Sequence, residues 1–261
     1  MKLSCREGMV PGETLKEKFK NLENWGYEGI EITGNVKERI EEIKEAEKES
    51  KVKVSTIAGV GGCLLSPERE ERERALSDMR ELLPLCSELG AVGVIFVPIF
   101  GGARLPDLSP LFSTVELEKE LLIEQLKVVA KDAESSGSFL LLEPLNRYET
   151  HFIRTLADGV EICKAVSSPN LKIMADFFHM NIEEEDIAQS LKQAASYVQH
   201  VHLADSTRLL PGYGHTDFKK PFAVLKEIGY DKYMALECSI PGEPQEELPK
   251  CAEYLRQCIK G

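Results

Sequence analysis

Short apolar segments alternate with longer amphipathic stretches from one end of the chain to the other. Eight of the short segments are rich in Val, Ile, Leu and Phe, which is typical of strands buried on both faces of a sheet. They are Lys2–Cys5, Gly29–Thr33, Val52–Ala58, Gly93–Phe100, Phe139–Leu145, Leu171–Phe177, Val198–Ala204 and Tyr233–Cys238. The pattern therefore predicts eight buried strands, each followed by a connecting segment.

The connecting segments show helical spacing of their apolar residues. One is opened by Ser66-Pro67-Glu68, a capping residue followed by a proline expected in the first turn. Its apolar positions are Leu76, Met79, Leu83 and Cys86. The last segment has the same spacing, at Leu248, Cys251, Ala252, Leu255, Cys258 and Ile259. We expect helices here, with the charged run Glu68–Arg74 as a solvated helix start.

Eight strand–helix repeats in 261 residues have the size and rhythm of a (β/α)8 TIM barrel. A single barrel domain over residues 1–261 is the predicted fold, because no linker or low-complexity tract divides the chain. A doubly wound open sheet is the alternative, and it normally carries a glycine-rich nucleotide-binding turn after an early strand. The stretch Gly59-Val60-Gly61-Gly62 lacks the spacing of that turn.

Four of the predicted strands deliver a metal-type side chain at their C-terminal ends. These candidate ligands are Glu143, Asp176, His202 and Glu237. In a barrel of this kind the chemistry lies at that end of the strands, and neighbouring strands are only about 4.8 Å apart. Any one of these residues alone could pair with an arginine or cap a helix. Together they form a mostly oxygen ligand set that suits Mn²⁺, Mg²⁺ or Co²⁺, with Zn²⁺ as a further candidate.

Composition narrows the classes of partner. The formal net charge is −12, which argues against a protein that tracks nucleic-acid phosphates. No apolar run is long enough for a membrane span, and the N-terminus lacks the apolar core of a signal peptide. The seven cysteines show no paired metal-binding spacing. We therefore expect a reduced cytoplasmic protein with a small-molecule substrate, no nucleic-acid partner and no membrane partner.

The strand-end motifs resemble those of a known family of sugar enzymes. The matching motifs are Glu143-x5-Glu149, Asp176-x2-His179-Met180-Asn181, His200-x-His202 with Arg208 six residues further on, and Glu237. They are similar to the ketose 3-epimerases, the D-tagatose/D-psicose 3-epimerase group of the xylose-isomerase-like sugar isomerase and epimerase superfamily. The resemblance is motif-specific from about Phe139 to Cys238, while the β/α rhythm extends it to the whole chain.

The resemblance implies a (β/α)8 barrel with one divalent metal ion, usually Mn²⁺ or Co²⁺, held by the four strand-end candidates. It implies that Glu143 and Glu237 are also the acid/base pair, working on opposite faces of the substrate. Glu149, His179 and Arg208 match positions that hydrogen-bond the carbonyl and hydroxyl end of the sugar. A homodimer or homotetramer is implied as well, because related barrels associate in this way.

The implied reaction is inversion at C3 of a ketose or keto-sugar acid. A carbon next to a ketone loses its proton more readily when a cation stabilises the enediolate. One carboxylate can take the proton while a second returns one on the other face, and Arg208 and His179 can stabilise charge on oxygen. The sequence differs from the epimerase pattern in two places. Cys5-Arg6-Glu7-Gly8, at the end of the first strand, lacks the aromatic signature of the ketohexose epimerases, and Pro98–Gly102, after the fourth strand, supplies no sugar-binding acid. The identity of the substrate therefore stays open.

Other activities use the same barrel. An aldose–ketose or hydroxypyruvate-type isomerase and an inosose-type dehydratase could use the same ligand set. An apurinic endonuclease of the endonuclease IV type needs three zinc ions and histidines after the early strands, yet none precedes His151. A non-catalytic sugar-binding barrel is the remaining alternative, and the presence of both Glu143 and Glu237 argues against it.

The remaining polar and aromatic candidates have weaker signals. His215, in the loop after the seventh strand, is a candidate contact for the distal part of the substrate or a surface histidine. His200 is expected in the core, and Arg104 is expected on the surface, with an acidic substrate group as the alternative partner. Trp25 and Tyr27 are expected to pack at a helix–strand junction.

Overall fold

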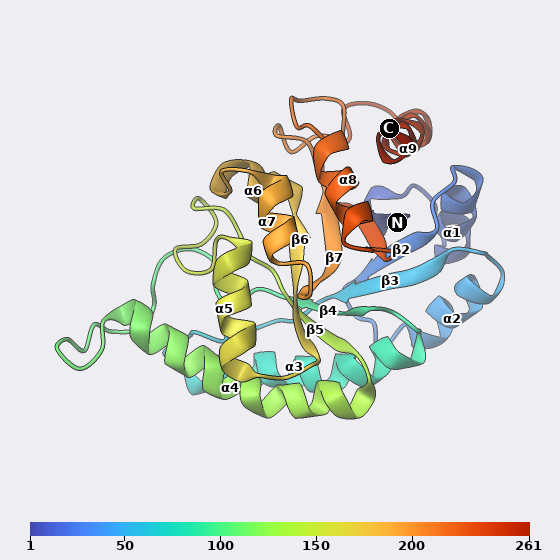
Figure 1. Ribbon diagram of the computed structural model, residues 1–261. Coiled ribbons are helices and arrows are strands. Elements are labelled where there is room, and N and C mark those ends of the chain that lie inside the picture. Colours follow the sequence, from blue (N-terminus) through green and yellow to red (C-terminus); the bar gives the residue numbers. More distant parts are fainter.

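The computed structural model describes residues 1–261 and contains a closed barrel of eight parallel strands in chain order (Figure 1). The strands are β1 Lys2–Arg6, β2 Gly29–Thr33, β3 Lys53–Ala58, β4 Gly93–Phe96, β5 Phe139–Leu142, β6 Leu171–Asp176, β7 Val198–Leu203 and β8 Tyr233–Leu236. Register between β1 and β8, with Lys2 opposite Tyr233, closes the ring. The predicted TIM barrel with one domain is confirmed, and the open-sheet alternative is excluded.

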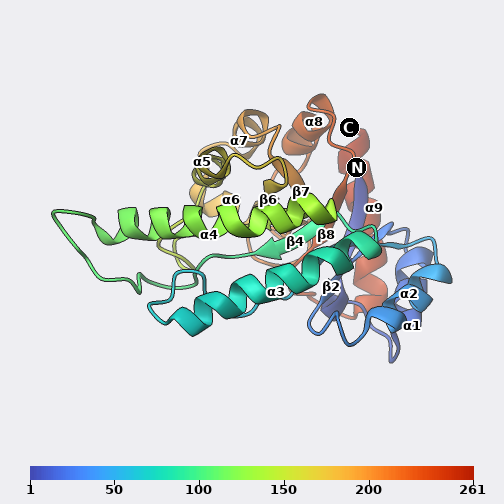
Figure 2. The ribbon, with the colours of Figure 1, turned by 90° about the horizontal axis from the view of Figure 1, so that it is seen from below.

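Helices surround the barrel, as the apolar spacing predicts. They are η1 Glu7–Met9, a 3-10 helix, and the α-helices α1 Leu15–Asn24, α2 Ile40–Lys48, α3 Arg69–Glu88, α4 Thr114–Ser136, α5 Leu156–Val166, α6 Phe177–Glu183, α7 Ile187–Gln193, α8 Lys219–Glu227 and α9 Pro244–Lys260. The long helices α3 and α4 lie side by side along one flank of the barrel (Figures 1 and 2). No helix combines the length and the apolar character needed to cross a membrane.

The predicted strands from β4 to β8 all end earlier than their apolar runs, and the differences are largest for β4 and β5. β4 stops at Phe96 and β5 at Leu142, although the apolar pattern continues to Phe100 and Leu145. Proline has no backbone N–H to donate to a sheet, and Pro98 and Pro144 follow closely after these two ends. The chain therefore leaves the barrel early, and the apolar residues beyond line the mouth of the barrel or the loops around it.

The predicted start of α3 is misplaced by a few residues. The helix begins at Arg69, and Glu68 is the N-cap without a side-chain capping bond. Pro67 therefore precedes the helix and is not in its first turn. Ser66 still shapes this start, because its Oγ accepts a hydrogen bond from the backbone N–H of Glu68 at 3.2 Å. The run Glu68–Arg74 is solvated as expected.

The packing expected for the helix–strand junction is confirmed. Tyr27 is buried, and its hydroxyl donates to the carbonyl of Leu248 at 2.8 Å, which ties the segment before β2 to α9. Trp25 lies half-buried against the same core. Most of the buried apolar residues form one continuous cluster that joins the barrel to its helices. This cluster fixes the strands, and so it fixes where their C-terminal ends meet.

Candidate metal and catalytic site

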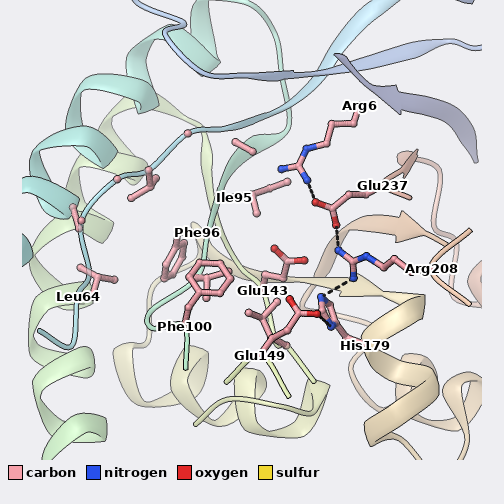
Figure 3. Close-up of a pocket in the computed structure, with 18 residues that line it drawn as sticks. Arg6, Leu64, Ile95, Phe96, Phe100, Glu143, Glu149, His179, Arg208 and Glu237 are labelled. Atoms are coloured by element: carbon pink, nitrogen blue, oxygen red, sulfur yellow. Dashed lines mark hydrogen bonds and ion pairs between the residues drawn. The ribbon is translucent and has the colours of Figure 1, made fainter. Parts of the chain in front are cut away.

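The C-terminal ends of β5 to β8 bring the four predicted ligands together. Glu143 follows β5, Asp176 is the last residue of β6, His202 lies near the end of β7 and Glu237 follows β8. One ligand atom from each lies within 4.8 Å of the others. Three carboxylates and one imidazole therefore converge on one point of the barrel mouth, part of which Figure 3 shows.

His202 directs one ring nitrogen at this point. Its Nε2 lies 2.9 Å from Glu31 Oε2, so Nε2–H is the donor of that hydrogen bond. Its Nδ1 lies 3.3 Å from Glu237 Oε2 and 3.7 Å from both Glu143 Oε1 and Asp176 Oδ2. Buried Nδ1 has no hydrogen-bond partner. A histidine whose far nitrogen is fixed by a carboxylate in this way is prepared to bind a metal through the other nitrogen.

The two carboxylate oxygens of Asp176 have different surroundings. Its Oδ1 caps α6 by accepting from the backbone N–H groups of Phe178 at 2.7 Å and His179 at 3.3 Å. Its Oδ2 is buried and has no hydrogen-bond partner. A buried carboxylate oxygen without a partner is costly. The unpartnered atoms of Asp176 and His202 point to the same place, so the residues present fit a divalent cation.

The charges around the site explain two strong pKa shifts. Burial alone would raise the pKa of Asp176, yet His202, His179 and Arg208 hold it well below its ordinary value. Burial alone would lower the pKa of His202, yet the carboxylates around it, chiefly Glu31, raise it well above its ordinary value. Ligands bind a cation in their deprotonated forms. A metal at this point would therefore compete with the proton on His202.

Glu31 is a functional residue that the sequence reasoning missed. It lies in the middle of β2 and is fully buried. Its Oε2 accepts from Thr56 Oγ1 at 2.8 Å and from His202, and lies 3.3 Å from His200 Nε2. This carboxylate orients His202, the candidate ligand. The sequence feature that could have predicted Glu31 is a glutamate inside the apolar strand Gly29–Thr33, because a charge at a buried position needs a buried partner.

Two arginines hold the carboxylate of Glu237 from opposite ends. Arg6 Nη1 pairs with Oε1, and Arg208 Nη2 donates to Oε2 at 3.1 Å (Figure 3). Arg6 Nε also lies 3.3 Å from Glu31 Oε1, so one guanidinium bridges the two acids. Arg208 has a positive φ of 60° and stacks over the ring of Phe178 at 4.5 Å. Arg6 belongs to the segment Cys5-Arg6-Glu7-Gly8, which lacks the aromatic signature of the ketohexose epimerases, and no role was predicted for it.

His179 presents a hydrogen-bond donor to the same region. The backbone N–H of Asn146 donates to its Nδ1 at 3.1 Å, so the ring proton is on Nε2. Nε2 lies 3.3 Å from Arg208 Nη1 and 3.8 Å from Asp176 Oδ2. Two donors, the imidazole N–H and the guanidinium, thus lie next to each other at the wall of the site. An oxygen atom that carries negative charge could accept from both.

These groups line a hollow of about 260 Å³, which we call the inner hollow. Glu143, Glu149, His179, Arg208 and Glu237 form its polar side. Asn146 Nδ2 donates to Glu149 Oε1 at 3.0 Å and holds that carboxylate near His179. The opposite side is formed by Gly59–Gly62, Ile95, Phe96 and Phe100, from the ends of β3 and β4. The hollow therefore has a charged wall and an apolar wall.

Four other candidate residues lie away from the inner hollow. His215 is exposed, and its Nδ1 lies 3.0 Å from Ser206 Oγ within its own loop. Arg104 pairs with Glu71 at 3.0 Å on the surface. His200 is fully buried, as expected for a core residue, though it faces Glu31. His151, which had no predicted role, lies 2.6 Å from buried Glu118 and links its loop to α4.

Comparison with known proteins finds one matching family and several similar proteins. The xylose isomerase-like TIM barrel family matches residues 19–258. The 3-dehydro-D-guloside 4-epimerase of Escherichia coli (strain K12) is 33% identical over 263 residues, covering 99% of this chain and 100% of that protein. A D-psicose 3-epimerase of Ruminiclostridium cellulolyticum is 35% identical over 178 residues, covering 67% of this chain and 58% of that protein.

Solved structures show the same relationship. The apo crystal structure of 3-keto-D-glucoside 4-epimerase from E. coli superposes with a TM-score of 0.91 at 32% identity, covering 99% of this chain and 100% of that one. The D-psicose 3-epimerase of Clostridium cellulolyticum H10 with D-tagatose superposes with a TM-score of 0.83 at 23% identity, which shows the shared fold.

Proposed function

Because the chain belongs to the xylose isomerase-like TIM barrel family, and its relatives are keto-sugar 3- or 4-epimerases, we propose a divalent-metal-dependent epimerase. It inverts a carbon next to the ketone of a keto-sugar. The observation that carries this proposal is the convergence of Glu143, Asp176, His202 and Glu237 on one point. Mn²⁺ is the metal we propose, with Co²⁺, Mg²⁺ and Zn²⁺ as competitors.

The residues of the site divide the reaction among them. A bound divalent ion supplies Lewis-acid polarisation of the ketone. Glu143 and Glu237 are the proposed acid/base pair: one carboxylate removes the proton next to the ketone, and the other delivers a proton to the opposite face. They reach the inner hollow from β5 and β8, which are separated around the barrel by β6 and β7. Two different directions of approach are what an inversion requires.

The hydrogen-bond donors beside these acids, His179 and Arg208, are proposed to stabilise negative charge on the substrate. His179 Nε2–H and the Arg208 guanidinium would hydrogen-bond the substrate oxygen on which charge develops. Glu149 would accept from a neighbouring hydroxyl of the sugar. This assignment covers inversion at C3 of a 2-ketose and at C4 of a 3-keto sugar equally, because both carbons lie next to a ketone.

Other reactions have less support. The isomerase and dehydratase alternatives share the ligand set, but two relatives that align with 99% and 85% of this chain are epimerases. All five histidines lie at or after His151, so β1 to β4 supply none for the trinuclear zinc site of an apurinic endonuclease. We also propose a homodimer or homotetramer, which light scattering of the purified protein would test.

The test is hydrogen exchange in D₂O. Protein stripped with a chelator and reloaded with Mn²⁺ or Co²⁺ is incubated with ketohexoses, ketopentoses, keto-sugar acids and 3-keto-glycosides, and the products are followed by NMR. We expect deuterium at the carbon next to the ketone together with its epimer, and only after metal is restored. An aldose product would replace the proposal by an isomerase, and absence of exchange across the panel would refute it.

A further inference from the structure

Glu118 on α4 is a buried acid that no step of the proposed reaction uses. It lies on the apolar face of the helix, which continues with Leu122 and Leu126, and it is fully buried. Its Oε2 lies 2.6 Å from His151 Nε2, and its Oε1 is buried without a hydrogen-bond partner. A buried acid with so few partners costs stability, and an apolar residue would fill this position without that cost. The contact with His151 is therefore what the acid contributes.

His151 connects this acid to the loop after β4. Its backbone N–H donates to the carbonyl of Gly101 at 3.1 Å, and its Nδ1 lies 3.1 Å from the same oxygen. A carbonyl can only accept, so Nδ1–H is the donor. The bond between Nε2 and Glu118 then needs one further proton, which either the ring or the acid carries. In both forms the ring makes two hydrogen bonds, one to α4 and one to the loop after β4.

The two loops that meet here carry residues of the inner hollow. Gly101 forms an isolated parallel bridge with Thr150, and its N–H donates to the carbonyl of Glu149 at 2.7 Å. Thr150 Oγ1 donates to the carbonyl of Ile99 at 3.0 Å. Phe100, which follows Ile99, and Glu149 both line the inner hollow (Figure 3). These bonds therefore fix the backbone beside both lining residues.

Burial does little to hold these two side chains, because Phe100 is 65% exposed and the side chain of Glu149 is 39% exposed. We propose that Glu118 and His151 are a positioning pair, which keeps Phe100 and Glu149 at the inner hollow and thereby sets the affinity for the substrate. This inference rests on the proposed epimerase function. Neither lining residue is a candidate metal ligand or part of the acid/base pair. Their displacement should therefore weaken binding of the ground state and the transition state alike, which raises KM and leaves kcat almost unchanged.

Two substitutions at Glu118 separate the contact from the packing. Glu118→Gln retains the contact, because its amide can donate to Nε2 while Nδ1–H still donates to Gly101. Glu118→Leu fills the position, removes the contact and leaves no buried charge. We expect the leucine variant, loaded with Mn²⁺, to show a KM for its best keto-sugar about tenfold higher, the effect of one charge-assisted hydrogen bond. Its kcat, and the KM of the glutamine variant, should stay within about threefold of normal.

The matched control is Glu120→Leu, because Glu120 is exposed on the same helix and does not line the inner hollow. Its KM should be normal. An unchanged KM in Glu118→Leu, or an equal rise in Glu120→Leu, would overturn the inference while leaving the epimerase intact. A loss of Mn²⁺ affinity in Glu118→Leu would also overturn it, because the effect would then lie in the barrel and not in the two loops.

A second measurement needs no turnover. The backbone amides of Gly101 and His151 donate across the two loops, and NMR in D₂O follows their hydrogen exchange. We expect exchange about tenfold faster in Glu118→Leu than in the normal protein or Glu118→Gln. Such a result would support the pair even if no ketone exchanged deuterium, which would refute the epimerase alone. Equal amide exchange in all three proteins would overturn the inference.

Discussion

The two halves of the barrel contribute to the site in different ways. β5 to β8 end in the four side chains that converge on one point, Glu143, Asp176, His202 and Glu237. β1 to β4 supply no group to that point. They supply Glu31 and Arg6, which hold His202 and Glu237 in place, and the wall of glycine and apolar residues opposite. The second half therefore supplies the candidate ligands and the proposed acid/base pair, and the first half supplies the groups that orient them and the opposite wall.

This difference between the two halves explains why the site defines the class of reaction more narrowly than it defines the sugar substrate. A ligand set and an acid/base pair define what can happen to a carbon next to a ketone. The choice of sugar depends on the space around it, and the apolar side of that space is formed by the ends of β3 and β4 and the loops after them. Variants in the second half should therefore lower kcat, whereas variants in the first half should change metal affinity or kcat/KM.

The largest effect is expected from Glu237→Gln in the second half. The amide cannot exchange a proton and is a poorer ligand, so we expect kcat to fall by about 10³-fold, near the range for general acid–base groups. Deuterium exchange in Mn²⁺-loaded protein measures the fall. Glu253→Gln, at an exposed site on α9, is the control. Exchange above a tenth of the normal rate would contradict the assignment of Glu237.

Glu31→Gln tests the orienting role of the first half. Loss of the carboxylate that fixes His202 Nε2 should weaken metal affinity by about 10- to 100-fold, while saturating Mn²⁺ should restore most of the activity. Calorimetric titration with Mn²⁺ gives the affinity. Exposed Glu45→Gln on α2 should bind metal normally. A variant with unchanged affinity would mean that Glu31 serves the fold alone.

Arg6→Ala should have a smaller effect. Its guanidinium bridges Glu31 and Glu237, and its removal leaves Glu237 with Arg208 as its remaining arginine partner. We expect kcat/KM to fall by about tenfold, the size of one charge-assisted hydrogen bond. Steady-state kinetics on the best keto-sugar measures it, with Arg69→Ala as the control, because Arg69 is exposed on α3, pairs with Glu73 and does not line the inner hollow. A loss as large as that of Glu237→Gln would erase the distinction between the two halves.

The smallest effect concerns stability, at Asp205 in the loop after β7. Its carboxylate accepts from the N–H groups of Ser206 and Gly212 at 2.8 Å and of Thr216 at 3.0 Å. Although burial would raise its pKa, these bonds lower the pKa below its ordinary value. Asp205→Asn replaces one acceptor by a donor and should cost about 1 kcal/mol of unfolding free energy.

The pH dependence of this loop has a definite sign. A carboxyl whose pKa is lower in the folded state stabilises the protein above its unfolded pKa, about 3.9, and that contribution is lost as pH falls through the folded value. The difference in urea midpoint between normal protein and Asp205→Asn should therefore be full near pH 7 and shrink below about pH 4. A difference that grows on acidification would contradict the lowered pKa.

The fold was predictable because each strand has its own local signature. Eight apolar runs with helical segments between them lead to a parallel barrel with few alternatives. The errors lie at the ends, where Pro98 and Pro144 stop β4 and β5 early and Pro67 lies before α3. The ligands were predictable for a related reason, since each directly ends or follows an apolar run. The roles assigned to these four residues stay predictions, which the variants described above test.

Sequence alone thus determined the barrel, the four candidate ligand positions and the class of chemistry, because strand periodicity and a charged residue at the end of a buried strand are local features. Tertiary structure decided which nitrogen of His202 faces the candidate ligands, the bridging position of Arg6, the contact of Glu31 with His202 and the apolar wall opposite the acids. Each of these depends on contacts between strands or loops that are far apart in the chain. Such contacts exist only once the barrel has closed.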